Sequence, residues 1–272
     1  MKNKGFLLLA SLFLTMISLP AHSSQTTIAL SPFEIIRIAV HNAEKNDLLK
    51  NGLISYQSRY IEQELWRNGT FKSTKKNETY RHGNAYPENI RKDANNTDYR
   101  MNWNGLLLNS YEYEILDPDR PEHKKFLQKY QLAGYPKSCG DCYLFKFRPK
   151  TTLPNVDDIA PVGAGLKEKG IHEAAMRMEG VVFINKEYIF IQRFTAGLDN
   201  SYNRAFGSVS ASRGLIDLEQ VLRQDLDNLI VFRRGEIMYQ IKFAYGIRAE
   251  TRKLIWEYDC YFLNSGPEPA CK

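Results

Sequence analysis

The stretch from Met176 to Asp199 constrains the fold more than any other part of this sequence. In its first half, apolar side chains recur at every second position on one face: Met176, Met178, Val182 and Ile184. Its second half repeats the pattern at Tyr188, Phe190, Phe194 and Ala196. β-Branched and aromatic residues at a period of two are typical of strands, and residues 185–187 supply a polar turn. Because both faces are partly apolar, we predict a hairpin central to a sheet and covered on at least one side.

The same alternation on both sides of this hairpin predicts a large antiparallel sheet. A long hairpin is expected over residues 53–81, with a very polar return strand from Phe71 onwards. Asn68-Gly69 marks its turn, a pair typical of turns in which both central residues have positive φ. Residues 233–235 are expected to form a turn between two later strands. Further strands are predicted at residues 143–148, 206–221, 229–232, 236–246 and 254–262.

Two helices complete the expected architecture. Ser31-Pro32 followed by Glu34 is a capping box with proline in the first turn, and a helix with Ile36 and Val40 on its apolar side should run to Asn51-Gly52. A short internal helix is expected at residues 119–130, whereas 83–98 and 149–170 are expected to be irregular and 104–105 a turn. The order of elements indicates an α+β fold: one open, strongly curved antiparallel sheet with helices on one face.

The N-terminus indicates export. Lys2 and Lys4 precede an apolar run that ends at Leu19, and Ala21-His22-Ser23 fits a cleavage site. We therefore predict a signal peptide at residues 1–23, a periplasmic location, one domain over residues 24–264 and a C-terminal tail at 265–272. A retained signal anchor is the alternative, although the apolar run is short for a membrane span. No transmembrane segment is expected in the mature chain.

The four cysteines all fall in the part of the chain predicted to be exported, which favours two disulfides. Three pairings are possible. We favour the local one because it requires no assumption about distant contacts. Cys139-Gly140-Asp141-Cys142 could instead be a redox centre if the first thiol lay at a helix N-terminus, but a strand is predicted to follow. The favoured bonds are Cys139–Cys142 and Cys260–Cys271.

Motifs for catalysis or cofactor binding are missing from the sequence. The histidines of the mature chain are isolated, and neither a nucleophile elbow nor a dinucleotide fingerprint occurs. The net charge is +6, and the basic residues are scattered among acidic ones rather than gathered in a stripe, which disfavours nucleic-acid binding. We expect no catalytic residue, no metal and no cofactor, and a protein that is not an enzyme.

The combination of a signal peptide, a leading helix, a long first hairpin and the segment Met178–Phe194 resembles the LolA/LolB-like lipoprotein-localisation carriers of bacteria. Gly207 and the strands around Ile237–Tyr245 and Leu254–Phe262 extend the likeness, although Asn185 stands where many relatives carry Asp. The resemblance implies an incomplete β-barrel with helices on its concave side. It also implies a non-enzymatic protein that binds lipid or lipoprotein acyl chains in an apolar cavity. The candidate lining residues are Ile36, Val40, Met178, Val182, Phe190, Phe194, Tyr239, Phe243 and Trp256.

Two other functions stay open. An envelope protein–protein adaptor would use the polar hairpin at residues 68–81 or the connection at 135–170, and its sheet interior would be fully packed. A thiol oxidoreductase would use Cys139 and Cys142. The many aromatic residues on the strands are themselves more typical of an ordinary packed core than of a cavity.

Overall fold

The computed structural model describes residues 30–44, 52–86, 103–129, 141–198, 210–243 and 248–266. The predicted signal peptide, Cys139, Cys271 and the predicted helix end at Asn51 lie outside these ranges.

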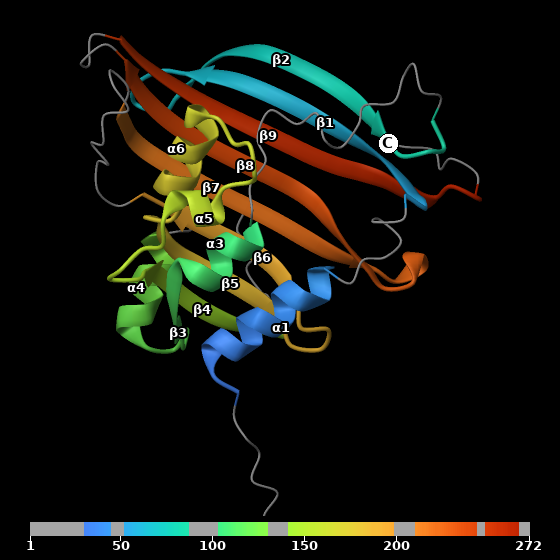
Figure 1. The fold of residues 1–272 in the computed structure, drawn as a ribbon, viewed down its shortest axis with the longest axis horizontal. Helices are drawn as coiled ribbons and strands as arrows, with labels where there is room; N and C mark the ends of the chain where they lie inside the picture. The colour runs from blue at the N-terminus through green and yellow to red at the C-terminus, as the bar shows by residue number, and fades with distance from the viewer. Residues whose placement is uncertain are drawn as a thin grey trace, which may run out of the picture. The chain divides into compact units, whose positions relative to one another are not determined.

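Nine strands form a single open antiparallel sheet in the spatial order β2-β1-β9-β8-β7-β6-β5-β4-β3 (Figure 1). From β3 to β9 each strand pairs with the next one along the chain, and the first hairpin is added beside β9. This arrangement confirms the predicted open, curved antiparallel sheet. The strands are β1 (Ile54–Leu65), β2 (Phe71–His82), β3 (Tyr111–Ile115), β4 (Cys142–Pro149), β5 (Glu179–Asn185), β6 (Ile191–Gly197), β7 (Ser210–Arg223), β8 (Leu229–Phe243) and β9 (Arg248–Leu263).

The helices are short. Within the described residues, none is long and apolar enough to cross a membrane. The capping box at the first helix is confirmed: the backbone N–H and hydroxyl of Ser31 donate to Glu34 Oε2 at 2.8 and 2.9 Å, and the Glu34 N–H donates to Ser31 Oγ at 3.3 Å. The helices are α1 (Pro32–Glu44), α3 (Trp103–Asn109), α4 (Pro121–Lys129), α5 (Val156–Ile159), α6 (Leu166–Ala175) and the 3₁₀ helix η2 (Gln224–Leu226).

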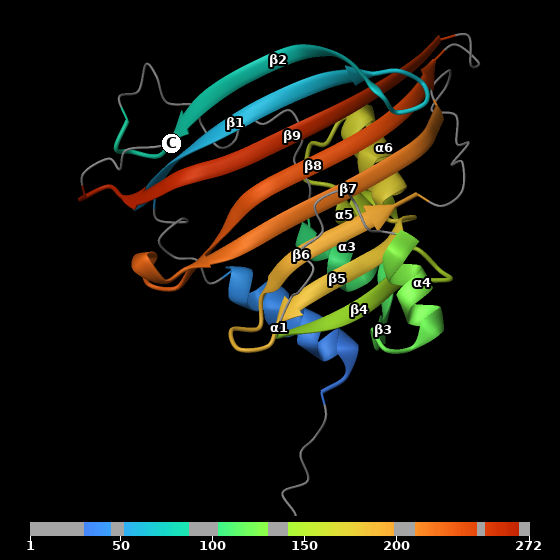
Figure 2. The same ribbon diagram turned by 180° about the vertical axis from the view of Figure 1, so that it is seen from behind.

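The sheet has two faces, which we name the α1 face and the α4 face after the helices that pack on them. Val182 points to the α1 face, where it joins one buried core with Ile36 and Val40. Val181 points the other way and packs in a second cluster with Phe126 of α4. Figures 1 and 2 show the two helices on opposite sides of the strands. The hairpin β5–β6 is therefore covered on both faces, which confirms the prediction of at least one.

The prediction that the internal helix lies on the same face of the sheet as the N-terminal helix is wrong. Helix α4 lies where residues 119–130 were predicted to be helical, but its Phe126 and Leu127 pack with Val181 and Phe183 on the α4 face. Successive strand residues point to opposite faces, so the odd-numbered apolar residues of β5 need a cover that α1 cannot provide. Helix α4 provides that cover.

Two segments predicted to be irregular are helical. Asn104 and Gly105, predicted to form a turn, lie inside α3, and Leu106 and Leu107 of that helix are buried in the core beside α1. The connection at 149–170 contains α5 and the beginning of α6. Gly170 lies inside α6, although glycine costs a helix about 1 kcal/mol relative to alanine. Burial against the sheet outweighs local preference in both places.

The last two strands depart from the prediction at bulges. Residues 233–235 are not a turn, because β8 runs without interruption and Arg233 is accommodated by a register shift against β7. Gly235 faces a crowded site, since an added Cβ would lie 3.3 Å from Leu218 Cδ2. In β9 the predicted alternation stops after Tyr258, where Cys260 has a φ of +54° opposite a shift in β1.

The sheet order narrows the disulfide pairing. Cys142 begins β4 and Cys260 lies in β9, with four strands between them. At about 4.8 Å per strand their separation is roughly 24 Å, whereas bonded cysteines have Cα atoms within about 7 Å. The pairing of Cys142 with Cys260 is therefore excluded, and the local pairing stays a prediction. The described residues contain no free cysteine.

Candidate ligand-binding surface

One row of directly paired residues crosses all nine strands on the α1 face and shows how that face changes along the sheet. The residues are Ile115, Phe145, Val182, Phe194, Leu218, Gly235, Trp256, Tyr60 and Glu78. Phe145, Val182 and Phe194 are buried beneath the helices, which contact the sheet mainly at β3 and β6. Trp256 and Tyr60 are partly exposed, and Glu78 on the edge strand is exposed. From Phe145 to Glu78, the residues of the α1 face thus change from buried core to partly exposed aromatic side chains and then to an exposed polar edge.

The predicted lining residues do not form one cavity wall. Five of them lie in the buried core between α1 and the sheet, where Ile36 and Val182 have no exposed surface: Ile36, Val40, Met178, Val182 and Phe194. Phe190 is also buried, whereas Tyr239 and Trp256 are partly exposed on β8 and β9. The side chain of Phe243 lies outside the described part of the structure. Helix α1 packs on the sheet as core, which is the arrangement that the sequence pattern alone favoured.

The partly exposed end of the α1 face carries four aromatic side chains, which we name the aromatic patch: Tyr56, Tyr60, Trp256 and Tyr258. Pairing of β1 with β9 brings them together, because Tyr60 lies opposite Trp256 and Ser58 opposite Tyr258. Ring centroids are 5.6 Å apart for Tyr60 and Trp256 and 6.2 Å apart for Tyr56 and Tyr258. The aromatic patch is thus built from the first and the last strands of the chain.

The base of the aromatic patch is fixed by further packing. The Tyr56 ring stacks on His82 at 4.5 Å and on Tyr261 at 5.0 Å. His82 Nε2 lies 2.8 Å from Ser58 Oγ, and the Tyr261 hydroxyl donates to the Phe232 carbonyl at 2.8 Å. Tyr56 and Tyr258 also pack on a small apolar core that contains Leu229 and Val231. These contacts hold the rings in place before any ligand is present.

Three polar atoms of the aromatic patch have no hydrogen-bond partner within the described residues: the hydroxyls of Tyr56 and Tyr258 and Nε1 of Trp256. Burial raises the pKa of both tyrosines, and for Tyr258 the neighbouring Tyr56 raises it further. Both phenols are therefore neutral hydrogen-bond donors at physiological pH. A surface with apolar rings and free donors suits a ligand with an apolar body and a hydrogen-bond acceptor.

A charged cluster borders the aromatic patch on β1 and β9. Arg252 Nη1 pairs with Glu62 Oε1 at 2.8 Å, and its guanidinium also bonds Glu250. Tyr60 donates weakly to Glu62 at 3.5 Å. Because the cation is already matched by two carboxylates, this cluster offers no free positive charge for an anion. The charged cluster therefore marks one border of the aromatic patch.

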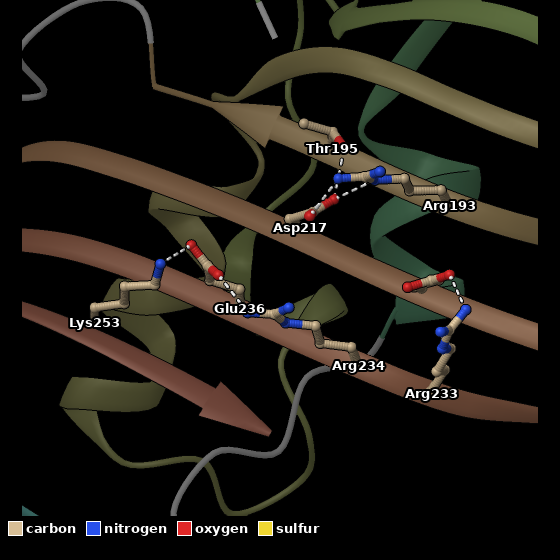
Figure 3. Close-up of polar contacts among 8 residues, drawn as sticks. Arg193, Thr195, Asp217, Arg233, Arg234, Glu236 and Lys253 are labelled. Carbon is tan, nitrogen blue, oxygen red and sulfur yellow. Dashed lines mark hydrogen bonds and ion pairs between the residues drawn. The ribbon is translucent and has the colours of Figure 1, made fainter. Parts of the chain in front are cut away.

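The α4 face of the central strands carries charges that neutralise one another (Figure 3). Arg193 forms two bonds of 2.8 and 2.7 Å with Asp217, which also accepts from Thr195 Oγ1 at 2.8 Å. Glu236 pairs with Arg234 at 3.4 Å and with Lys253 at 2.6 Å. Opposite charges facing one another across strands fix the strand register. The charges on this face are paired with one another, so it does not suit an apolar ligand.

A shallow depression of about 470 Å³ lies where α3, the end of β4 and α5 meet. Beside it in the chain, the buried hydroxyl of Ser110 has no hydrogen-bond partner among the residues that the structure describes. The depression is open, and none of the predicted lining residues contributes to it. Its lining residues are Asn109, Lys150, Thr152, Leu153, Pro154, Asp158 and Ile159.

The described residues supply neither a complete redox pair of cysteines nor a metal site. Cys142 is the first residue of strand β4, and Cys139 lies outside the described ranges. Across the described ranges, no group of three histidine, cysteine, aspartate or glutamate side chains could hold a metal ion. The structural role and the redox role of the C-x-x-C segment therefore both stay predictions.

Comparison of the chain with family models, with curated proteins and with solved structures finds no match. The resemblance to lipoprotein-localisation carriers therefore stays a prediction that rests on the sequence pattern.

Sequence analysis found Trp256 as a candidate but missed Tyr56, Tyr60 and Tyr258. The signal was present in part, because Tyr56 and Tyr60 share one face of the first predicted strand, as Trp256 and Tyr258 do in the last. The pairing of the first strand with the last one, which joins the two sets, is not encoded in either pattern.

Proposed function

We propose that this protein is an exported, non-enzymatic binding protein whose ligand is a lipid or another acyl-chain compound held on the aromatic patch. In this proposal the curved sheet acts as an incomplete barrel, and the packed α1 end forms a fixed wall rather than a lid. The observation that carries the proposal is a set of three donors, at Tyr56, Tyr258 and Trp256, that have no hydrogen-bond partner within the described residues and lie among aromatic rings.

The size of the aromatic patch explains why the ligand needs a polar group. Four partly exposed aromatic rings leave on the order of 200 Å² of apolar surface, worth about 5 kcal/mol on burial. Immobilising a ligand costs roughly that much or more. Apolar contact alone therefore gives weak binding, and hydrogen bonds from the free donors to a carboxylate, ester or phosphate oxygen supply the remainder.

Fluorescence titration with cis-parinaric acid tests the proposal. Tyr258→Phe removes one hydroxyl and keeps the ring, so binding is expected to weaken about threefold to tenfold. Trp256→Ala removes a ring from the patch and is expected to weaken binding more. Tyr188→Phe, in the turn between β5 and β6, is the matched control and should leave the affinity unchanged.

Unchanged affinity of both Tyr258→Phe and Trp256→Ala would refute the aromatic patch as the site. Native mass spectrometry of protein purified from its own envelope gives an independent check, because bound lipid is expected. Repeated recovery of empty protein would count against a carrier.

A further inference from the structure

The tip of the first hairpin is a rigid turn at the β2 edge of the sheet (Figure 2). The Gly69 N–H donates to the Trp66 carbonyl, and the Trp66 N–H donates to the Thr70 carbonyl, both at 2.8 Å. Asn68 Oδ1 accepts from the backbone and the hydroxyl of Thr70 at 3.1 and 2.7 Å. The turn lies where it was predicted, but only Gly69 has positive φ, at +91°. Arg67 and Asn68 form its centre.

This turn holds two large aromatic side chains in the solvent. Trp66 is 55% exposed and Phe71 is 58% exposed. Leu65, which pairs with Phe71, is buried. Exposed aromatic side chains at a fixed turn are typical of a surface that meets an apolar phase.

Positive charges surround the two aromatic residues. Residues 64–76 contain four cationic side chains and one carboxylate. Glu64 neutralises part of this charge, because Lys72 Nζ and Lys75 Nζ lie 2.5 and 2.7 Å from its oxygens. The hydrogen bond from Lys72, and then that from Lys75, lowers the pKa of Glu64 to about 2. Arg67 and Lys76 have no partner within the described residues.

From this combination we infer that the hairpin tip docks on an anionic lipid membrane. Trp66 and Phe71 enter the interface between headgroups and acyl chains, where amphipathic rings are favoured. Arg67 and Lys76 attract the anionic headgroups, each contributing about fivefold to the affinity. A protein partner fits less well, because a stable interface buries roughly 800 Å² on each side and the tip is a single turn. This inference does not depend on the aromatic patch.

Cosedimentation with vesicles tests the inference on the whole protein. Binding is expected to phosphatidylcholine vesicles that contain phosphatidylglycerol, and much less to phosphatidylcholine alone. Salt should weaken it by screening. The double variant W66A/F71A is expected to bind at least tenfold more weakly. Ile115→Ala is the matched control, because Ile115 is 54% exposed on the opposite edge strand, and it should bind as the wild type does.

Two results would overturn the inference: no binding to anionic vesicles, or equal binding by W66A/F71A and the wild type. Both substituted side chains are exposed, so the variant should unfold at the same urea concentration as the wild type. Parinaric acid binding separates this test from that of the proposed function. W66A/F71A should retain it, and Trp256→Ala should retain vesicle binding.

Discussion

Replacing Ile36 with alanine tests whether α1 is core or a movable lid. Ile36 has no exposed surface and packs in the main core with Val182 and Phe194. The change removes three carbon atoms, worth about 0.8 kcal/mol each, and leaves a cavity, so a loss of about 3–4 kcal/mol is expected. With a urea m-value of about 3 kcal/mol/M, the unfolding midpoint should fall by about 1 M.

The control for Ile36→Ala is the same substitution at an exposed isoleucine. Ile115→Ala removes the same atoms from an exposed position of an edge strand and should cost less than about 0.5 kcal/mol. Equal, small losses at Ile36 and Ile115 would show that α1 does not pack on the sheet. A small loss at Ile36 together with altered parinaric acid binding would restore the lid that the resemblance to carriers implies.

Three other outcomes are expected. Arg193→Ala should lower the free energy of unfolding in urea by about 3 kcal/mol, because it leaves the nearly buried Asp217 without its ion pair. Arg233→Ala, which removes the exposed member of its ion pair, should lower it by less than about 1 kcal/mol. Equal losses would contradict the burial of the Arg193–Asp217 pair. Burial raises the pKa of Tyr258 above its ordinary value of 10.0, so its contribution to stability is complete below pH 10.0 and declines as the pH rises through the folded pKa. A phenolate absorbance titration should show this tyrosine ionising later than free tyrosine, and a normal titration would refute the assignment. Peptide mapping without reduction is expected to find the two local disulfides, and a Cys142–Cys260 bond would contradict the sheet order.

The sequence correctly predicted the features that depend on interactions between residues close together in the chain. The helix start at Ser31 follows from a capping box whose bonds span three residues. The position of the first hairpin turn follows from Asn68-Gly69, because glycine tolerates the φ of +91° that Gly69 adopts there. The alternation in β5 correctly separated Val182 from Val181, since a strand has no other way to orient successive side chains.

Predictions failed where burial overrode local preference. Asn104-Gly105 is a strong turn signal, yet it is helical because the following leucines, Leu106 and Leu107, must reach the core beside α1. Arg233-Arg234-Gly235 likewise reads as a turn. There the ion pairs to Glu219 and Glu236 and the crowded site at Gly235 keep the strand continuous. None of these partners is near in sequence, except Glu236.

The candidate site depends on the one strand contact that no local pattern encodes. Every other neighbouring pair of strands from β3 to β9 is consecutive in the chain, so a simple meander accounts for it. The β1–β9 pair joins residues almost 200 positions apart, such as Tyr60 and Trp256, and it alone brings the two sets of aromatic residues into one surface. The sequence therefore predicted a sheet but placed the ligand under α1, where the structure has core. The donors without a partner in the described part of the chain lie instead where the first strand pairs with the last, so the proposed binding at Tyr258 requires that pairing to form.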